Sequence, residues 1–140
     1  MKLKKVILAS HGDLSKGMLH SIQVIIGKPS CDIETYSLYP GDSAVEYANK
    51  LNEEIKLHPN TQYIVIADVL GGSVHTALMQ ILDNDNLFLY SGMNMSMVLE
   101  VLTCFDDTDQ EKLSKFMEAG KEGITLMSKN SLVKIEDEEF

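Results

Sequence analysis

Arginine is missing from this sequence of 140 residues, and the fixed positive charges come from 12 lysines. Only arginine offers the planar pair of donors that grips a phosphate group at two points, so no such clamp can form here. A phosphate group would have to be held by backbone amides, hydroxyl groups, lysine or histidine. Aspartate and glutamate number 21, which gives a formal net charge of −9. Because this charge repels the phosphate backbone, we expect no nucleic-acid partner.

Cysteine is scarce, and long hydrophobic runs are absent. Cys31 and Cys104 match no zinc-binding or CxxC spacing, so we expect two free thiols in a reducing compartment. The apolar run before His11 is shorter than the roughly seven residues that a secretion signal needs. No run is long enough to cross a bilayer. These features predict a cytoplasmic protein.

The overall composition is typical of one ordinary globular domain. Hydrophobic residues make up 44% of the chain and charged residues 24%, which is far from the composition of a disordered protein. A chain of this length most often forms a single domain with a core of its own. We therefore expect one domain over residues 1–135, followed by an acidic tail over residues 136–140.

Apolar runs typical of buried strands alternate with segments whose apolar residues recur at helical spacing. We expect strands at residues 6–9, 33–39, 63–67 and 87–90, with a short last strand at 132–135. We expect helices at 14–26, between Ser43 and His58, from Ser73 as its cap to Leu82, and at about 96–105 and 108–128. This order predicts an α/β fold: a doubly wound, mostly parallel sheet of about four parallel strands plus the C-terminal strand, with helices on both faces.

Three loops at the carboxyl edge of this sheet are candidates for a functional site, because ligands of such sheets bind where strands run into helix N-termini. The loops span residues 10–13, 68–73 and 91–96. The first and third strands are expected to be central neighbours in the sheet. That arrangement would bring His11 and Asp68 side by side.

A histidine beside a carboxylate has a specific chemical use. The carboxylate accepts a hydrogen bond from one ring nitrogen, which fixes the tautomer and leaves the other nitrogen free to carry a group covalently. Gly71, Gly72 and Ser73 would offer amides and a hydroxyl at a helix start, where an anion is favoured. Gly12 would let the backbone approach His11 closely. Together these residues suit a phosphoryl group held on a histidine nitrogen.

Each feature also has a purely structural explanation. A lone histidine at a strand end is more often a structural residue, Gly-Gly-Ser before a helix is commonly a turn and cap, and Asp68 alone could order its loop. Of the remaining histidines, we expect His20 near a surface, His58 at a helix end and His75 beside the candidate site. A metal site of His11, Asp68 and His75 is a less favoured alternative, because their spacing matches no standard ligand pattern.

The same segments resemble the enzyme IIA component of the bacterial sugar phosphotransferase system, mannose/sorbose family. The resemblance rests on VILASHG at residues 6–12, YPG at residues 39–41, DVLGGS at residues 68–73 and GMNMSM at residues 92–97. These landmarks lie in the order that the family has and cover the chain down to about residue 128. Each motif alone is a weak indicator of the family, but the four motifs together are specific for it.

The resemblance implies a phosphotransferase that works through a phosphohistidine. His11 resembles the histidine that accepts the group from the phosphocarrier protein and passes it to an enzyme IIB, for sugar uptake through the membrane IIC and IID permease. Asp68 resembles the carboxylate that orients the ring, so that Nε2 is phosphorylated. The hydroxyl of Ser73 and the amides of Gly72 and Ser73 resemble the phosphoryl contacts. No metal, nucleotide or other cofactor is implied.

The resemblance also implies a homodimer in which the last strand, residues 132–135, reaches the partner's sheet. Val74 and Ser96 stand where the family has prolines, which implies altered loop rigidity rather than lost chemistry. Three alternatives stay open. One is the related phosphodonor subunit of the dihydroxyacetone kinase system, which the Asp-x-x-Gly-Gly-Ser loop disfavours. The others are a small metallochelatase that binds a divalent metal at His11 and His75, and a non-catalytic regulatory module with the same fold.

Overall fold

The apolar runs form the strands of one parallel sheet in the computed structural model, which describes residues 3–131. The spatial order of the strands is β2-β1-β3-β4, and every neighbouring pair is parallel. This arrangement confirms the predicted α/β class. The strands are β1 (Leu3–His11), β2 (Asp32–Leu38), β3 (Thr61–Ala67) and β4 (Leu87–Tyr90).

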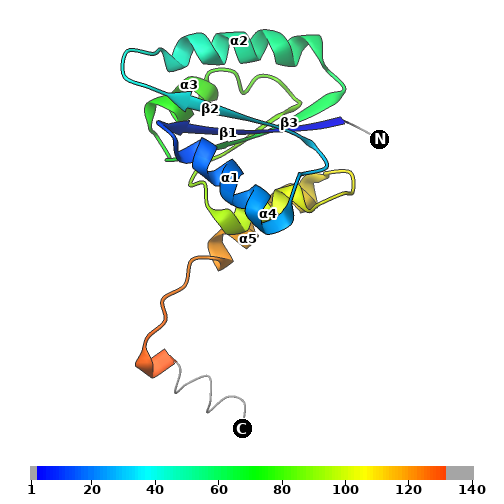
Figure 1. The fold of residues 1–140 in the computed structure, drawn as a ribbon. Helices are drawn as coiled ribbons and strands as arrows, with labels where there is room; N and C mark the ends of the chain where they lie inside the picture. The colour runs from blue at the N-terminus through cyan, green and yellow to red at the C-terminus, as the bar shows by residue number, and fades with distance from the viewer. Residues whose placement is uncertain (1–2, 132–140) are drawn as a thin grey trace.

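Helices cover both faces of the sheet. Alternate residues of its central strands point to opposite sides and are apolar on both, so each side needs a layer of helices to bury it. Ile7 and Ala9 of β1 belong to a core that α2 and α3 cover, and Val6 and Leu8 belong to a core that α1, α4 and α5 cover (Figure 1). The fold is therefore doubly wound, as predicted. The helices are α1 (Leu14–Ile26), α2 (Ala44–Leu57), α3 (Ser73–Met79), α4 (Met95–Leu102) and α5 (Gln110–Glu122).

The sheet topology brings His11 and Asp68 to the same edge. β1 and β3 are central neighbours, and their register pairs Ala9 with Ala67. The N–H of Asp68 then donates to the carbonyl oxygen of Ala9 at 3.1 Å, so the chain stays beside β1 for one residue beyond β3. Because the strands are parallel, the loops that follow them leave from one edge, and this register confirms the predicted neighbourhood.

The helix predicted at residues 108–128 ends earlier than its apolar spacing predicts. α5 ends at Glu122 instead of residue 128, and Gly123 stands at its C-terminal end. Glycine and the β-branched residues that follow it are weak helix formers. Residues 124–131 then leave the domain as an arm (Figure 1). α3 is also shorter than predicted, since it ends at Met79 and the chain continues in turns.

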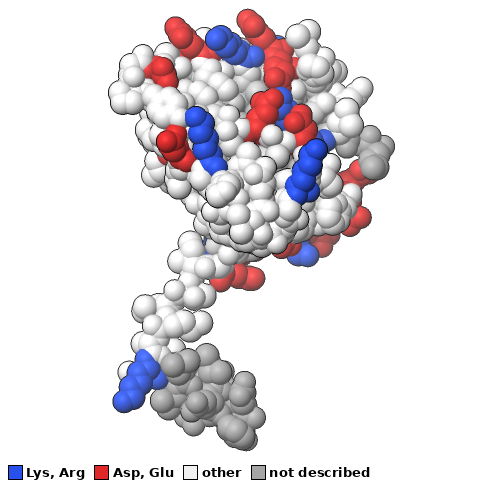
Figure 2. All heavy atoms as spheres, in the orientation of Figure 1, with Lys and Arg blue, Asp and Glu red and all other residues white. Residues whose placement is uncertain are grey.

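The predicted last strand at 132–135 and the acidic tail at 136–140 lie outside the described residues. Over residues 3–131, no helix is long and apolar enough to cross a bilayer. Figure 2 shows lysines and carboxylates mixed over one face of the molecule, around broad uncharged areas.

Candidate active site at the carboxyl ends of β1 and β3

His11 is the last residue of β1, and the chain turns sharply after it. Gly12 has a φ of +56°, a left-handed conformation that glycine adopts without strain. Its N–H donates to the carbonyl oxygen of Leu38 at 2.8 Å, which ties the turn to β2. The hydroxyl of Ser10 accepts the N–H of Ser15 at 2.8 Å and anchors the first turn of α1. The His11 side chain stays 46% exposed on this rigid support.

Asp68 holds His11 through one of its carboxylate oxygens and its own loop through the other. Oδ2 accepts the backbone N–H of His11 at 2.8 Å and lies 2.7 Å from Nδ1 of its ring. Oδ1 accepts the N–H of Val69 at 3.0 Å. Burial alone would raise the pKa of Asp68, but the hydrogen bonds from the backbone and ring of His11 outweigh it and lower the pKa below its ordinary value. The ionised carboxylate keeps the proton of the neutral ring on Nδ1, and Nε2 carries the free lone pair.

Ser73 lies at that lone pair. Its hydroxyl oxygen is 3.0 Å from Nε2 of His11, so the hydroxyl donates to the ring. The predicted capping role of Ser73 is wrong, because Gly72 occupies the N-cap and Ser73 is the first residue of α3. Gly72 has no side chain that could cap α3. The hydroxyl of Ser73 contacts the His11 ring and does not cap the helix.

A side chain at residue 72 would crowd the site, because the loop between β3 and α3, residues 68–73, lies against the His11 ring. A Cβ atom on Gly72 would lie 3.1 Å from Cε1 of His11 and 2.7 Å from Cγ1 of Val69. The N–H of Gly72 donates to the carbonyl oxygen of Val69 at 3.3 Å, within the turn of this loop. Gly71 has a φ of +77°, again in the left-handed region.

The remaining histidines lie where the sequence predicts. His20 is exposed on α1, and His58 stands at the C-terminal end of α2 with its Nδ1 2.8 Å from the carbonyl oxygen of Glu54. His75 lies next to the site on α3, but its Nδ1 accepts the N–H of Gly71 at 3.2 Å. Among residues 3–131, no three histidine, cysteine or acidic side chains gather closely enough to hold a metal ion.

The sequence does not predict a cluster of Asp13, Lys16 and Tyr39 on the rim of the site. The hydroxyl of Tyr39 donates to the carboxylate of Asp13, and Nζ of Lys16 lies 2.6 Å from the same hydroxyl. The lysine also lies over the tyrosine ring, 5.1 Å from its centroid. The YPG turn marks Tyr39 in the sequence, but its two partners come from the start of α1 and only the fold brings them together.

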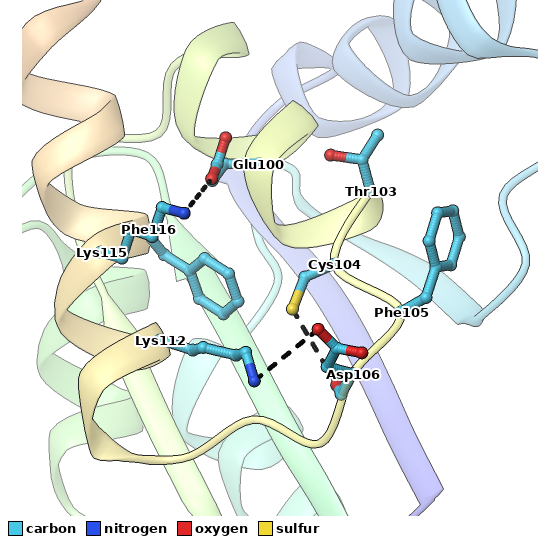
Figure 3. Close-up of a pocket in the computed structure, with 8 residues that line it drawn as sticks. All are labelled: Glu100, Thr103, Cys104, Phe105, Asp106, Lys112, Lys115 and Phe116. Atoms are coloured by element: carbon cyan, nitrogen blue, oxygen red, sulfur yellow. Dashed lines mark hydrogen bonds and ion pairs between the residues drawn. The ribbon is translucent and has the colours of Figure 1, made fainter.

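Two hollows of the described surface lie away from His11. One of about 840 Å³ opens at the opposite edge of the sheet, at the start of β1 and β3. Another of about 260 Å³ lies between the end of α4 and α5, where Lys112 faces Asp106 and Lys115 faces Glu100 (Figure 3). His11 lines neither of them and stands on an exposed edge. Small-molecule sites are usually concave and enclosed, so this open edge suits reaction with another protein.

Comparison with known proteins connects this arrangement to a family. The model of the EIIA-man family, described as the fructose IIA component of the phosphotransferase system (PTS), matches residues 5–119. A curated relative is the PTS sorbose-specific EIIA component of Klebsiella pneumoniae. It is 23% identical over 97 residues, which are 69% of this chain and 70% of the relative.

Solved structures agree with this match. The mannose/sorbose-specific IIA subunit of Enterococcus faecalis has a TM-score of 0.78 and 26% identity, with 91% of this chain and 96% of that chain covered. The EIIA component of Streptococcus agalactiae shares the fold, with a TM-score of 0.77, 22% identity and coverages of 89% and 97%. These findings give no support to a dihydroxyacetone kinase subunit or a metallochelatase. The chain belongs to the EIIA-man family and is a IIA component of a sugar phosphotransferase system.

Proposed function

We propose that His11 carries the phosphoryl group on Nε2, receiving it from the phosphocarrier protein and passing it to an enzyme IIB. The observation that carries this proposal is the 2.7 Å contact between Nδ1 and the Asp68 carboxylate. It keeps the proton on Nδ1 and leaves the lone pair on Nε2, on a side chain that is 46% exposed. A nucleophilic nitrogen is thus presented at a surface that a partner protein can reach.

The transfer is an in-line displacement between two histidines. The lone pair of Nε2 attacks the phosphorus of the phosphohistidine on the phosphocarrier protein, and a new N–P bond forms as the donor's N–P bond breaks. The leaving electron pair stays on the donor nitrogen. The His11 ring gains positive charge in this step, and Asp68 stabilises that charge through the N–H of Nδ1. In the second transfer, the acceptor on enzyme IIB attacks the phosphorus on His11. The Nε2–P bond breaks, and its electron pair returns to Nε2.

Neutral groups hold the phosphoryl group on His11 in this proposal. The Ser73 hydroxyl now lies 3.0 Å from Nε2, and it would rotate to donate to a phosphoryl oxygen once the nitrogen is occupied. The amide of Ser73 is a further proposed contact, and so is the amide of Gly72, which would exchange its 3.3 Å bond to the carbonyl oxygen of Val69 for the phosphoryl group. Gly12 and Gly71 would serve the site through their positive φ, which shapes the two turns beside the ring. Without an arginine clamp, the group is held weakly enough to be passed on. The chemistry needs no metal or nucleotide.

Exposed apolar side chains beside His11 supply a surface for the two protein partners. Leu14, Val69 and Leu70 are 53%, 50% and 74% exposed. They begin α1 and lie in the loop between β3 and α3, the two segments that flank the ring. The phosphocarrier protein and enzyme IIB would dock here in turn, and enzyme IIB would then serve the membrane IIC and IID permease.

We also propose that the protein works as a homodimer. The arm over residues 124–131 leaves the domain (Figure 1), and its Ile124, Leu126 and Met127 are 75%, 89% and 63% exposed. A second copy of the chain would cover these side chains. Sedimentation at micromolar concentration should give the mass of a dimer, and a chain truncated after Gly123 should be monomeric. A monomeric full-length chain would contradict this assembly.

The function is tested by incubation with the phosphorylated phosphocarrier protein. The wild-type protein should gain a label that is labile in acid and stable in base, and His11→Ala should gain none. His20→Ala is the matched control, because it removes another exposed histidine, on α1, and should be labelled normally. A label of that kind on His11→Ala at the wild-type level would rule the proposal out.

A further inference from the structure

The peptide groups of Gly71 are fixed by two side chains from the first turn of α3. The N–H of Gly71 donates to Nδ1 of His75 at 3.2 Å, and its carbonyl oxygen accepts the hydroxyl of Thr76 at 3.2 Å. Gly71 itself is exposed and has a φ of +77°. A glycine in this position has many alternative conformations, so bonds from outside the loop must select one.

The conformation of Gly71 matters because the next two residues contact His11. A Cβ atom on Gly72 would lie 3.1 Å from Cε1 of the ring, and the hydroxyl of Ser73 lies 3.0 Å from Nε2. Inside the loop, the N–H of Gly72 reaches the carbonyl oxygen of Val69 at 3.3 Å, near the long end of hydrogen-bond distances. A small movement at Gly71 would therefore shift both contacts to the ring.

His75 is suited to this task by its burial and its tautomer. The residue is 8% exposed, so water competes little for its ring. Because its Nδ1 accepts a hydrogen bond, the neutral ring carries its proton on Nε2. His11 holds its proton on Nδ1 instead, so the two histidines are in opposite tautomers.

We propose that His75 is a positioning residue for phosphoryl transfer, which sets the Gly71-Gly72-Ser73 segment against the ring of His11. This inference rests on the proposed phosphorylation of His11. Residue 75 touches neither the reacting nitrogen nor the transferred group. Its effect passes through the N–H of Gly71 to the Ser73 hydroxyl.

Three variants separate this role from simple packing. His75→Leu keeps much of the volume and removes the acceptor, whereas His75→Asn retains an acceptor close to the position of Nδ1. Thr76→Val removes the other bond to Gly71, but the carbonyl it frees is exposed and can bond water instead. Transfer from the phosphorylated phosphocarrier protein is measured for each variant, together with hydrogen exchange of the Gly71 amide in the unphosphorylated protein.

We expect His75→Leu to lower the maximal transfer rate about tenfold and to leave KM within about twofold, since the bond orders the site rather than the docking surface. His75→Asn should return the rate to within about threefold of wild type, and Thr76→Val should lose less than about threefold. Exchange of the Gly71 amide should become at least about tenfold faster in His75→Leu and stay slow in His75→Asn.

Wild-type transfer in His75→Leu would overturn the inference, and so would equal slowing in the leucine and asparagine variants with wild-type melting temperatures. If His75→Leu does not fold, His75→Asn is compared with His75→Gln, whose acceptor reaches too far. Equal rates in that pair would also contradict the proposal. If the wild-type protein accepts no phosphoryl group, the proposed function fails, and the Gly71 exchange rates still show whether His75 holds the loop.

Discussion

One carboxylate oxygen of Asp68 accepts two hydrogen bonds from a single residue, the backbone N–H and the ring Nδ1 of His11, at 2.8 and 2.7 Å. The first bond fixes where β1 ends relative to the loop after β3, and the second fixes the tautomer of the ring. Structural support and chemical activation therefore depend on the same oxygen. A change at Asp68 should disturb both, and the two effects can be measured separately.

Replacement of the carboxylate by an amide tests the activating role. Asp68→Asn keeps the size of the side chain, but its amide can donate to Nδ1 and so favour the tautomer with the proton on Nε2. We expect the protein to fold and its transfer rate to fall on the order of tenfold to hundredfold. Single-turnover kinetics with the phosphorylated phosphocarrier protein measure this change. An unchanged rate in Asp68→Asn would show that the tautomer does not limit transfer.

The structural role of the carboxylate predicts a particular pH dependence. The bonds from His11 hold the pKa of Asp68 below its ordinary value of 3.8, despite the opposing effect of burial. The stability that these bonds give is fully present above that ordinary value and is lost as the pH falls through the folded-state pKa. The difference in free energy of unfolding between wild type and Asp68→Asn should therefore shrink as the pH falls below 3.8. Denaturant titrations across this range provide the test, and a gap that widens in acid would contradict it.

A methyl group at residue 72 should disturb the site directly. The added Cβ of Gly72→Ala would lie 2.7 Å from Val69 and 3.1 Å from the His11 ring. We expect a loss of about 1–3 kcal/mol in the free energy of unfolding and transfer at least about tenfold slower. Gly17→Ala is the matched control, because Gly17 lies within α1 and has nothing within 4 Å of the new methyl group. It should stabilise the protein by about 0.5–1 kcal/mol and transfer normally. Equal behaviour of the two variants would show that residue 72 needs no glycine.

The hydroxyl of Ser73 should matter for transfer and little for stability. Ser73→Ala removes the donor 3.0 Å from Nε2 and is expected to slow transfer about tenfold or more. The residue is exposed and does not cap α3, so the melting temperature should hardly change. Ser73→Thr keeps the hydroxyl and should stay within about threefold of wild type. Equally slow transfer in both variants would argue against a role for the hydroxyl.

Sequence reasoning predicts most of the scaffold but less of the site's detail. The buried runs of β1 and β3, together with the rules for parallel sheets, are enough to place His11 beside Asp68. The hydrogen bond from Ser73 to Nε2 is not predictable in the same way, because it depends on the path of a loop. That path follows from the left-handed conformation of Gly71 and from the missing side chain at residue 72.

The difference between the predicted and observed ends of α5 has a related cause. Ile124, Leu126 and Met127 continue an apolar pattern that favours a longer helix, yet all three are exposed. They belong to the arm over residues 124–131, which leaves the domain in Figure 1. Apolar spacing indicates which residues need cover, but it does not indicate whether the same chain provides it. His75 is a similar case at the level of one side chain. Its position beside the site follows from the sequence, whereas its bond to Gly71 depends on how the ring is packed.

The central claim, that Nε2 of His11 carries the phosphoryl group, is tested most directly by NMR of the phosphorylated protein. A long-range proton–nitrogen spectrum distinguishes the two ring nitrogens of each histidine, and coupling to phosphorus identifies the one that is bonded. The Asp68 contact predicts phosphorus on Nε2 of His11, with the proton retained on Nδ1. Phosphorus on Nδ1 of His11, or on the ring of any other histidine, would contradict the account.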